Sequence, residues 1–130
     1  MANIEPYAAK SVYDPPGYAQ AVKVSGAQTM LFLAGQFDYT ADGGVAHPGD
    51  FKAQARACLQ AVKAQVEAGG GTVADIVKIN TYLTDIRHRT DVASIREEFL
   101  GKKQPASTLV AVSALAFPEW LIEIEAIAVL

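Results

Sequence analysis

The chain has 130 residues, of which 51% are hydrophobic and 19% are charged, and its formal net charge is −3 at pH 7. This length and composition indicate one globular domain, residues 1–130, and exclude a disordered chain. The acidic balance, without a basic cluster, argues against nucleic acid as a partner, and no apolar run reaches the roughly 20 residues of a membrane span.

The first half of the chain predicts two strands and one long helix. Residues 1–17 are rich in proline and turn formers and predict an irregular lead-in. Residues 19–24 alternate weakly, as in a strand, whereas residues 29–34 are apolar on both faces, which is typical of a central strand. From about 50 to 68 the apolar period is helical, with Asp50 suited to the N-cap and three glycines, 69–71, ending the helix.

The second half predicts a strand at 76–85, a helix at 90–100 and strands at 106–112 and 121–130. Two amphipathic helices can cover only one face of the resulting sheet. Several strands nevertheless carry apolar or aromatic residues on their second face: Met30, Phe32, Tyr82, Ile127 and Val129. We therefore expect another copy of the chain to cover that face, giving a homo-oligomer.

The last strand places two carboxylates within the most apolar segment of the chain. Its even-numbered positions, from Ile122 onward, form a core face, whereas Glu123 and Glu125 share the other face with aliphatic residues. Two glutamates exposed on an outer strand face are the commoner case. A carboxylate on a half-covered face instead gains a raised pKa and can hold a water or a substrate proton.

Other reactive residue types give weaker signals. His47 and His88 lack metal-ligand spacing, so no metal site is expected. Cys58 is the one cysteine and lies on the apolar stripe of the long helix, which predicts a buried, inert thiol. A single cysteine cannot form an internal disulfide, and no signal-peptide pattern is seen, so we expect a cytoplasmic protein. The run at 87–89, R-H-R, fits either a solvated loop or a clamp for a substrate carboxylate.

Several segments, in order, resemble one family. Residues 17–22, G-Y-A-Q-A-V, resemble its G-P-Y-S-Q-A-V segment, and residues 33–36, L-A-G-Q, resemble its S-G-Q. Residues 75–78 and 83–85 resemble D-V-V-K and V-T-D, and residues 122–129 match I-E-I-E-A-I-A-V. On these motifs the chain is identified as a member of the Rid (reactive intermediate deaminase) family, also called YjgF or endoribonuclease L-PSP.

The resemblance implies an α/β (α+β) fold of the chorismate-mutase type, with a six-stranded mixed sheet and two helices on one face. It also implies a homotrimer, in which the sheets form a barrel and small molecules bind in clefts between subunits. Active relatives hydrolyse imines and enamines without a metal or organic cofactor. By the same resemblance Glu123 positions the attacking water, and Tyr18 and Gly35 bind substrate.

One position departs from the family pattern. In the segment that resembles P-A-R-S, Ser107 stands where the family has the arginine that binds the substrate carboxylate. A hydroxyl cannot replace the charge of a guanidinium, so a non-standard substrate is expected, with Ser107 lining the cleft and Arg87 as a substitute cation. Two functions stay open: a hydrolase for imines, enamines or related metabolites, and a non-catalytic trimer that binds a metabolite. Nuclease activity ranks low because no basic patch is present.

Overall fold

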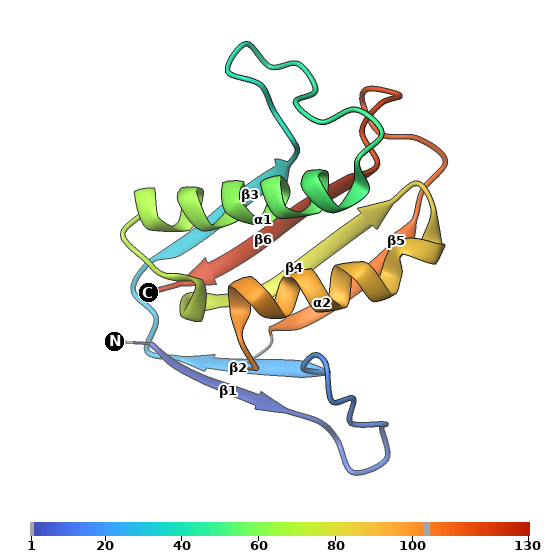
Figure 1. The fold of residues 1–130 in the computed structure, drawn as a ribbon. Coiled ribbons are helices and arrows are strands. Elements are labelled where there is room, and N and C mark those ends of the chain that lie inside the picture. Colours follow the sequence, from blue (N-terminus) through green and yellow to red (C-terminus); the bar gives the residue numbers. More distant parts are fainter. Residues whose placement is uncertain (1, 103–104) are drawn as a thin grey trace.

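The computed structural model describes residues 2–102 and 105–130, which form six strands and two α-helices (Figure 1). The strands are β1 (Asn3–Tyr7), β2 (Ala21–Ser25), β3 (Met30–Gln36), β4 (Ile76–Leu83), β5 (Ala106–Ala111) and β6 (Ile122–Val129). The helices are α1 (Phe51–Ala68) and α2 (Arg89–Leu100), and short 3-10 turns at Val73–Asp75 and Ile86–His88 precede β4 and α2.

The strands form two sheets rather than the single six-stranded sheet that the family resemblance implied. The larger sheet has the order β3-β6-β4-β5, in which β4 and β5 are parallel and the other pairs are antiparallel. Strands β1 and β2 form an antiparallel pair of their own. An isolated parallel bridge between Ala19 and Ala106 connects this pair to the edge of β5, with the Ala19 amide donating to the Pro105 carbonyl at 3.1 Å.

Both helices lie on one face of the larger sheet, as expected (Figure 1). The core lies between them and the sheet, where the even-numbered residues of β6 are buried from Ile122 to Ala128. The Asp50 side chain accepts a hydrogen bond from the Ala53 amide at 3.1 Å and caps α1, and Gly69 follows its last turn. The predicted period, cap and stop of this helix are confirmed.

The prediction of an irregular lead-in at 1–17 was wrong for its first part, because β1 spans Asn3–Tyr7. This strand pairs only with β2 and buries little of its surface, so its sequence lacks the apolar alternation that identifies a half-buried strand. Pro6 is tolerated because an edge strand leaves amide positions unpaired.

The second face of the larger sheet is open and carries exposed apolar residues on β3 and β5. Phe32 and Met30 of β3 are 71% and 55% exposed there, and Val110 of β5 is also exposed. Val129, predicted for this face, is instead buried at the end of β6. Large exposed apolar side chains grouped on one sheet face are typical of a protein interface.

Candidate functional site

Glu123 and Glu125 lie on the open face of β6 and differ in their partners. The Glu125 carboxylate accepts hydrogen bonds from the Tyr82 hydroxyl and from the Asn80 side-chain amide, both on neighbouring β4. None of the described residues donates a hydrogen bond to the Glu123 carboxylate. Glu125 is thus held in place by β4, whereas Glu123 keeps its acceptor positions free for a water or a ligand.

The environment of Glu123 favours its protonated form. Burial, followed by the nearby charge of Glu125, raises the pKa of the Glu123 carboxyl above its ordinary value. Desolvation and a like charge both disfavour the ionised form of an acid. A raised pKa makes a carboxyl a better proton acceptor than an ordinary glutamate, which favours its use in general acid–base chemistry.

A β-bulge in β3 brings Gly35 against Glu123. Leu33 pairs with Ala126, but Gln36 pairs with Ile124, so β3 carries one extra residue at this point. A Cβ atom at Gly35 would overlap the Glu123 carboxylate, and only glycine leaves that space. The bulge therefore sets the position of the carboxylate that the sequence singled out.

A shallow hollow of about 350 Å³ opens beside Glu123. Its wall consists of Tyr82 and Glu125 from the sheet and of apolar residues from the segment after β5, namely Val112, Ala114, Leu115 and Ala116. Tyr18 and Ser107 do not line it. A water and a small polar group fit such a hollow, with an apolar wall on one side.

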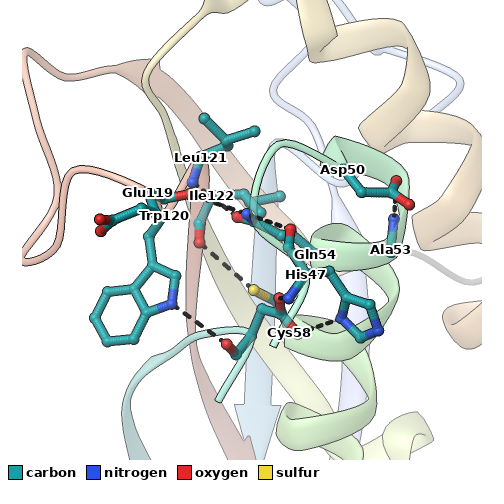
Figure 2. Close-up of polar contacts among 10 residues, drawn as sticks. His47, Asp50, Ala53, Gln54, Cys58, Glu119, Trp120, Leu121 and Ile122 are labelled. Carbon is teal, nitrogen blue, oxygen red and sulfur yellow. Dashed lines mark hydrogen bonds and ion pairs between the residues drawn. The ribbon is translucent and has the colours of Figure 1, made fainter. Parts of the chain in front are cut away.

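The start of β6 is held by a buried glutamine that the sequence analysis did not identify (Figure 2). The Gln54 side-chain amide donates to the His47 and Glu119 carbonyls, each at 3.0 Å, and its carbonyl accepts from the Leu121 amide at 2.8 Å. Gln54 has no exposed surface. Gln54 therefore joins α1 to the loop before α1 and to the loop before β6. Its partner Leu121 lies two residues before Glu123.

Ser107 and Tyr18 line a different and larger hollow, of about 780 Å³, between α2, β5 and the 13–18 segment. Ser107 pairs in register with Ile79, a core residue, so its side chain lies on the helix side of the sheet. Glu123 pairs with Tyr82 and lies on the opposite face. Within one chain, Glu123 therefore lies in one hollow and the predicted substrate-binding residues Tyr18 and Ser107 in another, and Gly35 lines neither.

Arg96 of α2 was also missed by the sequence analysis. It lines the larger hollow, and its Nη1 donates to the Ser107 hydroxyl at 2.8 Å, while Nη2 donates to the Gly17 carbonyl at 3.3 Å. Burial lowers the pKa of Arg96 below its ordinary value. A guanidinium thus contacts Ser107, one of the predicted substrate-binding residues.

Arg87 lies apart from both hollows. Its guanidinium makes three contacts of 2.7–3.1 Å with the Asp85 carboxylate, and its side chain is 87% exposed. The hydrogen bonds from Arg87 lower the pKa of Asp85 to about 2. Arg87 is therefore an exposed arginine paired with its neighbour at the turn before α2.

His47 and Cys58, which the sequence analysis considered, have structural partners. His47 Nδ1 lies 2.8 Å from the buried Asp38 carboxylate, and the Trp120 indole donates to the Asp38 carbonyl at 3.3 Å. The Cys58 thiol is fully buried, as predicted, and donates to the Ile122 carbonyl at 3.5 Å (Figure 2). Burial raises the pKa of this thiol well above its ordinary value, which makes it a poor nucleophile.

Residues 2–102 and 105–130 contain no group of three histidine, cysteine or acidic side chains that could hold a metal ion. No helix within these residues is long and apolar enough to span a bilayer.

Comparison with known proteins agrees with this fold. The family model described as "Endoribonuclease L-PSP" matches residues 10–130. A RutC family protein of Pyrococcus horikoshii is 39% identical over 111 residues, which cover 85% of each chain.

Solved structures extend the likeness over almost the whole chain. A Rid family protein of unknown function from Yersinia pestis superposes with a TM-score of 0.87 at 30% identity, covering 98% of this chain and 99% of that one. RidA from an Antarctic Psychrobacter gives a TM-score of 0.72 at 31% identity, with coverage of 96% and 93%. The chain therefore belongs to the Rid family of proteins, also called the YjgF or endoribonuclease L-PSP family.

Proposed function

We propose that the chain is a small-molecule hydrolase that acts on an imine, an enamine or a related reactive metabolite, with Glu123 as the catalytic acid and base. The observation that carries the proposal is the state of the Glu123 carboxylate, which has a raised pKa, lines a hollow and accepts no hydrogen bond from the described residues. Gly35 leaves the space that this carboxylate occupies. An enzyme of this kind needs no organic cofactor, because the substrate carbon is already electrophilic.

The proposed active form is a homotrimer whose clefts lie between subunits. Tyr18 and Ser107 lie on one side of the sheet and Glu123 and Gly35 on the other, so one chain cannot bring all four to one ligand. A neighbouring subunit can place its Glu123 and Gly35 beside Tyr18 and Ser107 of the first subunit. The open sheet face of that neighbour would then be buried in the contact. This arrangement would also cover Phe32 and Met30.

In the proposed reaction, the Glu123 carboxylate accepts a proton from a water as the water oxygen attacks the imine carbon. Glu123 delivers that proton to the imine nitrogen, which gives a carbinolamine. It then moves the hydroxyl proton to the amine nitrogen, ammonia leaves, and a carbonyl compound is released. An enamine enters the same route after tautomerising to its imine.

Ammonia release from a panel of charged and neutral imines and enamines tests the proposal. Glu123→Gln keeps the size of the side chain but cannot accept a proton, so we expect a loss of about 10²–10⁴-fold. Glu125→Gln, the same change two residues along the same face, should cost less than about 10-fold, because Glu125 is engaged by Tyr82 and Asn80. Full activity of Glu123→Gln would rule out this mechanism.

A second proposed function is a metabolite-binding trimer without turnover. It is favoured by the serine at position 107, where the family resemblance implies an arginine. Binding to the folded protein raises its melting temperature whether or not chemistry follows. Ligands that stabilise the protein without being consumed would support binding over hydrolysis.

A further inference from the structure

Arg96 is a buried cation without an anionic partner. The side chain is only 7% exposed, and none of the described carboxylates accepts a hydrogen bond from it. Its Nε is buried and has no hydrogen-bond partner at all within the described part of the chain. Buried arginines are normally paired, because desolvating an unpaired charge costs free energy. The Arg96 guanidinium therefore lacks a negatively charged hydrogen-bond acceptor among the described residues.

Hydrogen-bond donors remain unused at this position. A guanidinium carries five N–H hydrogens, and the bonds to Ser107 and to the Gly17 carbonyl use one each from Nη1 and Nη2. The Ser107 oxygen accepts from Arg96, which leaves its own O–H free to donate. Both side chains thus offer hydrogens, and the group that fits them is an acceptor with negative charge.

The hollow they border has the size and charge for a small anionic metabolite. Its volume of about 780 Å³ falls within the range of ligand sites. Its described lining carries three cations, Arg89, Arg96 and Lys102, against one carboxylate, Glu97. Tyr13 and Tyr18 add aromatic walls that suit the organic part of a ligand.

We propose that Arg96 and Ser107 together bind the carboxylate group of a small organic acid in the hollow beside α2. Arg96 reaches the site from the helix and supplies the charge, while Ser107 on β5 supplies a hydroxyl donor. The planar guanidinium suits the planar carboxylate, which can accept from two of its hydrogens at once. The inference deepens the proposed function, on which it rests for any reaction that follows binding.

Calorimetric titration with pyruvate, its methyl ester and inorganic phosphate tests the site directly. Pyruvate should bind the wild-type protein, and Arg96→Gln should weaken that binding by about 10-fold or more because the charge-assisted bonds are lost. Ser107→Ala should weaken it by a smaller factor. Arg56→Gln removes the same charge from an exposed arginine that pairs with Glu98 outside the hollow, and should leave the affinity unchanged.

A charge-conserving variant keeps the test decisive if Arg96→Gln unfolds. Arg96→Lys retains the positive charge but loses the planar pair of donors, so it should still bind pyruvate, but more weakly than the wild type. Unchanged pyruvate binding by folded Arg96→Lys would contradict the role of the guanidinium. No pyruvate binding by the folded wild type, equal binding of the methyl ester, or tighter binding of phosphate would each overturn the carboxylate site. Pyruvate binding that survives in an inactive Glu123→Gln variant would separate this site from the proposed reaction.

Discussion

At the scale of single residues, Glu123 makes the free energy of unfolding depend on pH. Its pKa is raised in the folded protein by burial and by Glu125. Because the pKa of Glu123 is higher in the folded than in the unfolded protein, the protonated side chain favours the folded state. This stabilisation is complete below the unfolded-state pKa and is lost as the pH rises through the folded-state pKa. Above the folded-state pKa, the ionised Glu123 side chain therefore destabilises the fold relative to a neutral amide at the same position.

We expect Glu123→Gln to raise the free energy of unfolding at pH 7 by about 0.2–1 kcal/mol, the range for partly exposed charge interactions. The gain should vanish as the pH falls below the unfolded-state value of 4.5. Urea denaturation at pH 7 and pH 4 measures both. Glu119→Gln in an exposed loop should show no such difference, and an equal gain at both pH values would contradict the assignment.

The sequence predicted the strand face on which Glu123 lies but not the surroundings of this side chain. The alternation of residues 121–130 places this carboxylate on the second face of the strand, and the family motif selects it over Glu125. Arg96 was missed because R-E-E in a helix resembles a solvent face. Its spacing, four residues after Val92 and three before Phe99, was the available signal, since these positions share one helical face.

At the scale of elements, the helices were predictable and the strand details were not. The 3.6-residue period and the Asp50 cap fixed α1 to within one residue. No periodic signal marks β1, whose residues are mostly exposed, or the bulge at Ala34 and Gly35, which depends on pairing with β6. Pairing between distant segments is a tertiary property that local patterns do not carry.

The contacts of Gln54 predict how strongly α1 and β6 depend on each other. Gln54→Leu has a similar volume but leaves the Leu121 amide and two carbonyls without their partner, and each buried unpaired group costs about 1–3 kcal/mol. We expect a loss of about 2 kcal/mol or more in denaturant unfolding. Gln60→Leu, the same change at an exposed position of α1, should stay within about 0.5 kcal/mol. A small loss at Gln54 would show that its bonds are dispensable.

At the scale of the whole molecule, the open apolar face of the larger sheet predicts association. Phe32 is 71% exposed in the single chain, so it adds little to the core but would be buried between subunits. We expect light scattering after size-exclusion chromatography to give three times the 13.8 kDa chain mass. Phe32→Glu should give folded monomers, because a buried unpaired charge opposes association.

Lys52→Glu on the helix-covered side is the matched control and should leave the trimer intact. A monomeric wild-type protein would remove the basis for clefts between subunits.

The placement of Arg96 and Glu123 in hollows that share no lining residue has a consequence for mixtures of variants. In a trimer whose sites combine one half from each neighbour, a subunit without Arg96 still carries an intact Glu123, and the reverse also holds. Refolding two inactive variants together would then restore complete sites at some of the contacts. Activity that reappears on mixing, and that neither parent possesses, is the signature of a site divided between chains.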